Sequence, residues 1–327
     1  MLQYIARRIL LMVPTLFFIS LVTFLIIDLA PGDYLSSYVA QMAEQGQMAD
    51  SQAVQRLREQ YGLNKPFYVK YAKWLDRLAH GDLGYSMEWK RPVKQLLGDR
   101  VLLTFVLAVS TLVFTWIIAF AIGIFSAVRQ YSFLDYAATF FGFLGLAVPE
   151  FLFALVLMWI AYAYFGQSVG GLFSPQYADA PWSLGKVKDL IAHLWIPMLV
   201  LGTHGTAGLI RVMRANLLDE LHKPYVVTAR AKGLPELRAL IKYPVRAALN
   251  PFVSTVGWYL PTLVSGSVIV AIVLNLPITG PLLLRALLSK DMYMAGSFIF
   301  ILSVLTVIGT LVSDVLLAWL DPRIRLG

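Results

Sequence analysis

Two ionisable side chains stand inside long apolar stretches of the sequence. Glu150 follows Pro149 in one stretch, and His204 lies in another, within the segment LGTHGTAG. A carboxylate or imidazole in apolar surroundings is costly unless it meets a counter-charge, a hydrogen-bond partner or water. Glu150 and His204 are therefore candidates for contact with a polar solute. The structural alternatives are an ion-paired or protonated Glu150, and a His204 that serves helix packing together with its small neighbours.

The sequence lacks common motifs of enzymatic sites. It has no G-x-x-x-x-G-K-[ST] phosphate loop and no H-E-x-x-H metal motif, and its four histidines are scattered. It has no cysteine, so no disulfide and no cysteine-based metal site can form. We predict no catalytic residue, no metal site and no cofactor in this chain.

The composition is that of an integral membrane protein. Of 327 residues, 58% are hydrophobic and 14% are charged, whereas soluble domains have roughly 45–50% and about 25%. A soluble core of this size could not cover the excess apolar surface. The net charge of +8 comes from basic residues that flank the apolar stretches, which is the pattern that sets membrane orientation. Because no separate basic stripe stands out, nucleic-acid binding is not expected.

Six stretches are long enough to cross a bilayer as helices, which takes about 20 mostly apolar residues. The first is longer than the core of a signal peptide and no clear cleavage site follows it, so we expect it to be retained. The third is long enough to tilt, or to break near Pro149. The predicted spans are residues 9–29, 101–128, 136–165, 191–212, 252–275 and 295–320.

Positive charges near the spans predict that both termini are cytoplasmic. Basic residues precede the first span, follow the second and sixth, and gather between the fourth and fifth. The segment 31–100 is too long for this rule, and we place it on the outer face. It contains SQAVQRLREQYGL and PFYVKYAKWLDRLAHGDLG, whose apolar residues recur at helical spacing and predict short helices. The loop at 166–190, which includes PWSLGKVKDL, is expected to form a further lid-like piece.

The basic segment between the fourth and fifth spans has the pattern of two short helices joined by a tight turn. LHKPYVVTARAKG can form a helix ending at Gly233, a residue suited to the left-handed cap position. Pro235 suits the first turn of a second helix, and Pro244 can bend the chain that follows. Such an elbow could rest on anionic lipid headgroups or dock into a groove of a partner protein.

Ordered motifs along nearly the whole chain resemble one family. ARAKGL, at 229–234, resembles the cytoplasmic EAA loop of binding-protein-dependent ABC importers, in the form found in the dipeptide/oligopeptide/nickel permease family. The long segment after the first span resembles that of the B-type subunit. The other matching motifs, in chain order, are APGD, YGLNKP, GDLGYS, RPV, VPEF, SGSVIV and DPRIR.

This resemblance implies an all-α integral membrane protein with the type I ABC importer permease fold and six transmembrane helices. It implies an N-terminal transmembrane helix at 1–30, an extracytoplasmic helical segment at 31–100, and a permease core at 101–327 with a coupling elbow at about 213–250. Gly233 would form the turn of the elbow. The residues that would couple the chain to an ATPase are Ala229, Arg230, Ala231, Lys232, Gly233 and Leu234.

For function, the resemblance implies a permease subunit of an ATP-driven importer in the plasma (inner) membrane of a prokaryote, with peptides as the first expectation. One or two separate ATPase subunits would bind ATP and Mg. A sister permease and an extracytoplasmic solute-binding protein would complete the importer. Glu150 and His204 would then be the candidates for its translocation pathway. Alternatives are another solute (an oligosaccharide, a nickel chelate or an opine-like compound), an ATPase-coupled scaffold or sensor, and an ATP-independent pore.

The chain departs from the family pattern after SGSVIV. Ala271 stands where the family usually has a glutamate, and LNLPITG replaces its glycine-containing pattern. Glu150 instead adds an acid at a variable position of the VPEF motif. These departures bear on which solute is carried rather than on the elbow.

Overall fold

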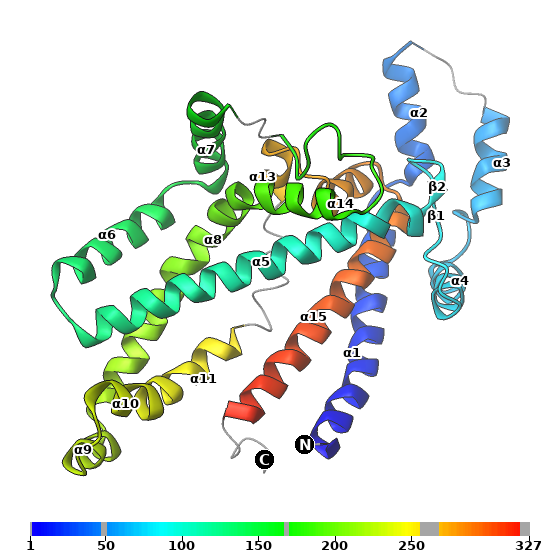
Figure 1. Cartoon of the computed structure of the whole chain (residues 1–327). Coiled ribbons are helices and arrows are strands. Elements are labelled where there is room, and N and C mark those ends of the chain that lie inside the picture. Colours follow the sequence, from blue (N-terminus) through cyan, green and yellow to red (C-terminus); the bar gives the residue numbers. More distant parts are fainter. Residues whose placement is uncertain (1, 47–50, 167–169, 256–267, 321–327) are drawn as a thin grey trace. The chain divides into compact units, whose positions relative to one another are not determined.

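The computed structural model describes residues 2–46, 51–166, 170–255 and 268–320, and this part of the chain is almost entirely helical (Figure 1). Its one sheet pairs β1 (Tyr85–Ser86) with β2 (Arg91–Pro92). The helices are α1 (Leu2–Leu29), α2 (Tyr34–Glu44), α3 (Ser51–Tyr61), α4 (Phe67–Ala79), α5 (Val93–Val128), α6 (Phe133–Ala147), α7 (Glu150–Phe165), α8 (Leu184–Leu221), α9 (Pro224–Ala231), α10 (Glu236–Leu240), η1 (Ile241–Val245), α11 (Arg246–Ser254), α13 (Val268–Val273), α14 (Thr279–Leu288) and α15 (Met292–Leu320).

Four of the described helices are long and apolar enough to cross a membrane, and the bent pair α6–α7 counts as a fifth span. The four are α1, α5, α8 and α15, and they coincide with the first, second, fourth and sixth predicted spans. The fifth predicted span, 252–275, lies partly outside the described residues, so the count of six stays a prediction. The chain is thus a multi-pass membrane protein by length and composition of its helices.

The third predicted span breaks at Pro149, as the sequence suggested. α6 and α7 meet there at a bend of 105°. Proline fixes its own backbone and pushes the preceding residue out of the helical region, and Val148 is accordingly extended, with ψ 124°. The break makes Glu150 the first residue of α7. A carboxylate at this position interacts favourably with the positive end of the helix dipole.

The described chain forms two compact units, which we describe separately. The first comprises residues 1–6, 105–277 and 308–327, and the second comprises residues 7–104 and 278–307. In the first unit, α6, α7 and α11 all pack against α8. The core around α8 is closed by side chains from α5, η1 and α11, and its buried members are Ala119, Ala127, Leu209, Ile210, Met213, Leu217, Val245, Ala248 and Phe252.

In the second unit, α4 packs onto α1 and α15 through aromatic side chains. Trp74 of α4 is 1% exposed and its ring lies 5.5 Å from that of Phe24 in α1. Its indole N–H donates to the Ser297 hydroxyl of α15 at 3.1 Å, which in turn donates to the carbonyl of Leu83. The short helices predicted within SQAVQRLREQYGL and PFYVKYAKWLDRLAHGDLG are confirmed as α3 and α4.

The GDLGYS motif has a structural role within this second unit. The fully buried Asp291, just before α15, accepts hydrogen bonds from the Ser86 hydroxyl at 2.6 Å and from the Glu88 backbone N–H at 3.1 Å. Gly84 has φ +88° and lies against the ring of Tyr293, where a side chain would be strained. Motif and helix start are thereby held together across some 200 residues of sequence.

The expected lid-like piece around PWSLGKVKDL is wrong in part, because α8 begins at Leu184 and runs through it. Ser183 caps this helix by accepting from the Lys186 N–H. The Lys186 ammonium is buried over the rings of Phe173 and Trp182, at 4.8 and 5.3 Å from their centroids, and donates to the Ala180 carbonyl at 2.6 Å. These contacts hold residues 184–190 as the first turns of α8, so most of the segment is not a separate lid-like piece.

A substitution at Gly145 tests how closely α6 packs on α8. A Cβ at this position would lie 2.5 Å from the Thr203 methyl carbon, whereas one at Gly208 of α8 would meet nothing within 4 Å. Gly145→Ala should therefore lower the thermal stability of the purified protein by about 1–3 kcal/mol, the usual cost of overpacking. Gly208→Ala should not. The double variant Gly145→Ala/Thr203→Ser, which removes the methyl, should recover the loss, and failure to recover would contradict this packing.

Candidate functional site: the helical elbow and the Glu150 cavity

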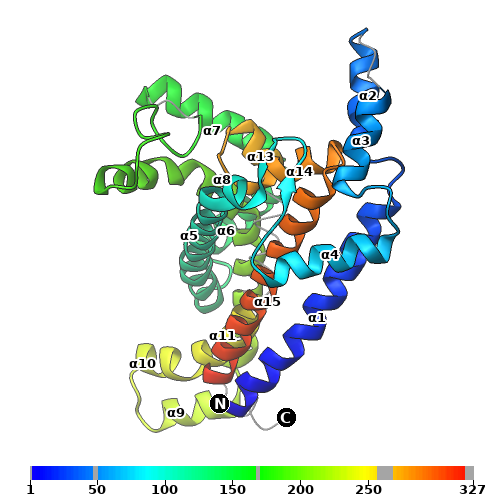
Figure 2. The same cartoon turned by 90° about the vertical axis from the view of Figure 1, so that its right-hand side faces the viewer.

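The predicted elbow is a hairpin of two short helices that follows α8 directly. α9 begins after Lys223 with Pro224 in its first turn, and α10 begins after Pro235. Figure 2 shows the two helices lying side by side as the arms of a hairpin at one end of the first unit. Proline costs nothing in the first turn of a helix because the N–H there has no helical partner.

Gly233 closes the turn between the two arms, as predicted. Its φ is +78°, a conformation that glycine adopts without strain. The Gly233 N–H donates to the Arg230 carbonyl at 2.9 Å, and the Leu234 N–H donates to the Ala229 carbonyl at 3.3 Å. This pair of bonds is the Schellman motif, which satisfies the last carbonyls of a helix. A Cβ at Gly233 would meet nothing within 4 Å, so only the backbone conformation requires glycine.

Most of the six residues predicted for coupling lie on the surface of the elbow. Arg230, Ala231, Lys232 and Gly233 are exposed, and Leu234 is half-buried. Ala229 is buried against the rest of the hairpin together with Val226 and Ala239. Apolar side chains are exposed beside this basic turn, and they are Val227, Leu237 and Ile241. The outer side of the turn thus exposes small, basic and apolar groups, and its inner side packs against the rest of the hairpin.

A clasp at Glu220 joins the elbow to α8. The Tyr225 hydroxyl donates to one carboxylate oxygen of Glu220, and the Lys223 ammonium donates to the other at 2.5 Å. Burial, then the hydrogen bond to Glu220, raise the pKa of Tyr225 above its ordinary value, so its hydroxyl stays a donor. The Tyr225 ring also lies 6.3 Å from that of Tyr243 in η1. The first arm is therefore tied both to α8 and to the chain that leaves the elbow.

The second arm continues through a π-helical turn into the core. η1 contains Pro244, which has no N–H to offer the helical ladder, and such widened turns accommodate the loss. Pro244 and Val245 are buried, and α11 then packs on α8. Both arms of the elbow are thus connected to the same helix, α8.

A broad groove of about 760 Å³ runs beside the elbow. Its walls come from the end of α5, the end of α8 and both arms, and include Arg129, Tyr131, His222 and Leu237. Arg230 lines it too and pairs with Glu236 across the turn at 2.5 Å. The groove and the exposed turn form one continuous, largely basic and apolar surface.

Glu150 borders a separate cavity of about 290 Å³ between α6, α7 and α8. The carboxylate is half-buried, and it accepts no hydrogen bond and forms no ion pair with any residue that the structure describes. The exposed His204 is close enough to Glu150 for an electrostatic interaction between the two side chains. The other residues that line the cavity are Phe141, Leu144, Gly145, Val148, Phe153, Val200 and Thr203.

The neighbours of His204 serve helix packing. Thr203 meets Gly145 of α6, Gly202 meets Phe114 of α5, and Thr206 and Ala207 are buried. This supports the packing interpretation of LGTHGTAG, in which small residues let helices approach closely. His204 itself is exposed and lies near Glu150.

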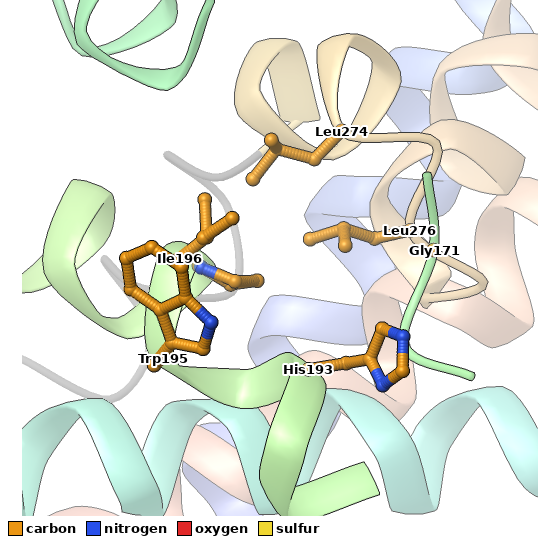
Figure 3. A pocket seen from close by; sticks show the side chains of 7 residues that line it. Gly171, His193, Trp195, Ile196, Leu274 and Leu276 are labelled. Carbon is orange, nitrogen blue, oxygen red and sulfur yellow. The ribbon is translucent and has the colours of Figure 1, made fainter. Parts of the chain in front are cut away.

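A third cavity, shown in Figure 3, is too small for a solute. It measures about 10 Å³, roughly the space of one water. His193, Ile196 and Leu274 lie around it, and the Gly171 N–H donates to the Leu274 carbonyl at 2.9 Å. The loop that contains Gly171 is thereby attached to the end of α13 and lies beside α8. Ala271 of α13, in place of the usual glutamate, is fully buried.

Sequence reasoning missed the ion pair that fixes the start of α6. Asp135, near the start of α6, is 3% exposed and accepts two hydrogen bonds of 3.1 and 3.0 Å from the guanidinium of Arg214 in α8. It also accepts from the Tyr131 N–H. The available signal was Ser132 three residues before Asp135, a helix-start pattern that predicts the cap but not its partner. Within the described residues, no cluster of His, Asp and Glu is arranged to hold a metal.

The helices long enough to span a membrane and the exposed helical hairpin describe a multi-pass membrane protein, and the comparison with known families gives its class. The family model of the binding-protein-dependent transport system inner membrane component matches residues 119–326, and that of the N-terminal part of such membrane components matches residues 1–108. The chain belongs to this family of binding-protein-dependent transport system inner membrane components.

Relatives match over the whole chain. The oligopeptide transport system permease protein AppB of Bacillus subtilis is 36% identical, over 99% of this chain and 100% of its own length. The dipeptide transport system permease protein DppB of Escherichia coli K12 is 30% identical, over 99% of both chains. The glutathione transport system permease protein GsiC of Escherichia coli O6:H1 is 31% identical, over 99% of both chains.

The Glu220 clasp should stabilise the elbow locally. Tyr225→Phe removes one hydrogen bond to a carboxylate, and because Tyr225 is 39% exposed we expect the opening free energy of α9 to fall by about 1 kcal/mol. Hydrogen–deuterium exchange of the α9 amides measures it. Glu236→Gln, which breaks the exposed pair with Arg230, is the matched control and should change exchange little. Equal effects of both variants would contradict the clasp.

Proposed function

We propose that this chain is the transmembrane permease subunit of an ATP-driven, binding-protein-dependent importer for peptides, and forms half of its translocation pathway. The observation that carries the proposal is the exposed Schellman elbow built onto α8, in a chain of this family. The peptide assignment rests on the relatives, whose names specify oligopeptide, dipeptide and glutathione transport.

In this proposal the elbow is the coupling helix. The turn from Ala229 to Leu234 docks into a groove of a cytoplasmic ATPase subunit, with Arg230 and Lys232 supplying charge and Gly233 the tight turn. ATP and Mg bind to one or two such ATPase subunits and not to this chain. Closure of the ATPases moves the elbow, and the contacts of both arms with α8 carry the movement into the membrane.

Glu150 and His204 line the translocation pathway in this proposal. The α6–α7 break opens a half-buried carboxylate to a cavity at the depth of a predicted span. A sister permease subunit completes the pathway, and an extracytoplasmic solute-binding protein delivers the solute to it. Apolar side chains exposed along α6 and α7, such as Phe140, Phe151 and Trp159, contact the lipid bilayer or the sister subunit.

The termini lie in the cytoplasm of a prokaryote and the segment 31–100 on the outer face of its plasma (inner) membrane. The distribution of basic residues around the spans supports this orientation. No nucleic acid is among the proposed partners. Solute binding can drive the transport cycle only through its different affinity for the outward- and inward-open states.

Gly233→Val tests the elbow. Valine at φ +78° is strained, so the turn should distort and peptide uptake should fall by about tenfold or more, which requires only about 1.4 kcal/mol of lost coupling free energy. Membrane insertion and co-purification with the sister subunit should persist. Uptake of labelled peptides into cells with the complete importer measures the effect.

Gly81→Val is the matched control for this test. Gly81 ends α4 with φ +75°, a Cβ added to it would meet nothing within 4 Å, and the N–H groups of Gly81 and Asp82 make the same pair of bonds back to α4. It carries the same backbone strain outside the elbow and should retain uptake. Unchanged uptake in Gly233→Val, or an equal loss in both variants, would contradict the coupling role.

A further inference from the structure

We propose that Glu150 binds the primary ammonium group at the amino end of the transported peptide. This inference rests on the proposed function and names the chemistry that the Glu150 cavity recognises. It starts from a carboxylate that borders a cavity of about 290 Å³ without a hydrogen-bonding or ion-pairing partner among the described residues.

The walls of the cavity make a cation the fitting ligand. Apart from Glu150, they are apolar side chains and glycine, with Thr203 as the one further side chain that carries a polar group. The Thr203 hydroxyl is already bonded to the Leu199 carbonyl of its own helix at 2.5 Å. A half-buried carboxylate in such a setting gains most from a charged hydrogen-bond donor, because charge-assisted bonds are strong where water is sparse.

The size of the cavity suits one end of a peptide rather than a whole oligopeptide. Ligand cavities commonly measure roughly 300–1,000 Å³, and this one lies at the lower limit. A free amino terminus has a pKa of about 7.7–8.0 and is mostly protonated at neutral pH. Peptides of every length and sequence carry this group, so a single carboxylate can bind all of them. The apolar walls of the cavity would contact the side chain of the first residue.

His204 is an ionisable side chain close to the proposed ammonium site. It lies within electrostatic range of Glu150 but forms no ion pair with it among the described contacts. It therefore leaves the carboxylate open to an incoming ammonium. The bend of 105° at Pro149 is what brings Glu150 to the end of a helix instead of inside one, with its side chain beside α8.

The test uses the complete importer in liposomes: this chain, its sister permease, the ATPases and the binding protein. The probe is a mixture of di-, tri-, tetra- and pentaalanine at pH 7, with uptake followed by mass spectrometry. Glu150→Gln keeps the shape and removes the charge, so uptake should fall about tenfold or more, the factor expected for one hydrogen bond to a charged group. Glu150→Asp should recover part of it. ATP hydrolysis stimulated by the loaded binding protein should persist in both.

Asp76→Asn is the control, since it removes an exposed carboxylate from α4 and should leave uptake unchanged. Wild-type uptake by Glu150→Gln, with uptake still lost in Gly233→Val, would overturn the ammonium site and leave the permease proposal standing. Loss of the sister subunit on purification of Glu150→Gln would also overturn it, since the counter-charge would then belong to that subunit. Unchanged uptake in both variants would overturn the ammonium site and the coupling role of the elbow. Uptake that persists when this chain is left out of the liposomes would reject the permease proposal itself.

Discussion

A helix that ends inside a bilayer leaves backbone N–H and C=O groups without hydrogen-bond partners in the hydrocarbon. This constraint limits the positions at which a membrane-spanning chain can break a helix or turn. Proline or glycine stands at the two breaks in the described chain that concern the candidate sites. Pro149 divides a span and exposes Glu150 at a helix start. Gly233 turns the chain back on itself and exposes the basic tip of the elbow.

α8 connects these two places physically. It is 38 residues long, about 57 Å at the usual rise. Val200 and Thr203 in its middle line the Glu150 cavity, and Glu220 at its end holds the elbow. Its core contacts with α5 and α11 include the fully buried Met213 and Leu217. Between the elbow and the cavity, α8 is thus a continuous, well-packed helix segment of about 25 Å that links the two sites directly.

Local patterns were sufficient to predict most of the elements. Runs of apolar residues predicted four of the spans, proline predicted the break at Pro149, and the glycine and proline spacing predicted both arms of the elbow and the cap at Gly233. The candidate Glu150 was visible as an acid in apolar sequence. These features depend on neighbours a few residues apart, which a sequence displays directly.

The interactions that hold the elements together were not predictable in the same way. Asp135 pairs with Arg214 across 79 residues, and Asp291 pairs with Ser86 across 205. Nothing local distinguishes these acids from interfacial ones, because their partners come from other helices. The cavity of Glu150 was not predictable for the same reason, because its walls belong to three helices. The start of α8 looked like part of a loop in the sequence, but the contacts of the buried Lys186 with two aromatic rings hold it as a helix.

The central claim is that the elbow docks on a protein and not on lipid. Photo-crosslinking from the exposed position 232 in the intact importer tests it most directly, by Lys232→p-benzoylphenylalanine with a matched replacement at the exposed Asp76 of α4. The account predicts an adduct between position 232 and the ATPase subunit, and none with the ATPase from position 76. Adducts of position 232 with lipid alone would contradict it.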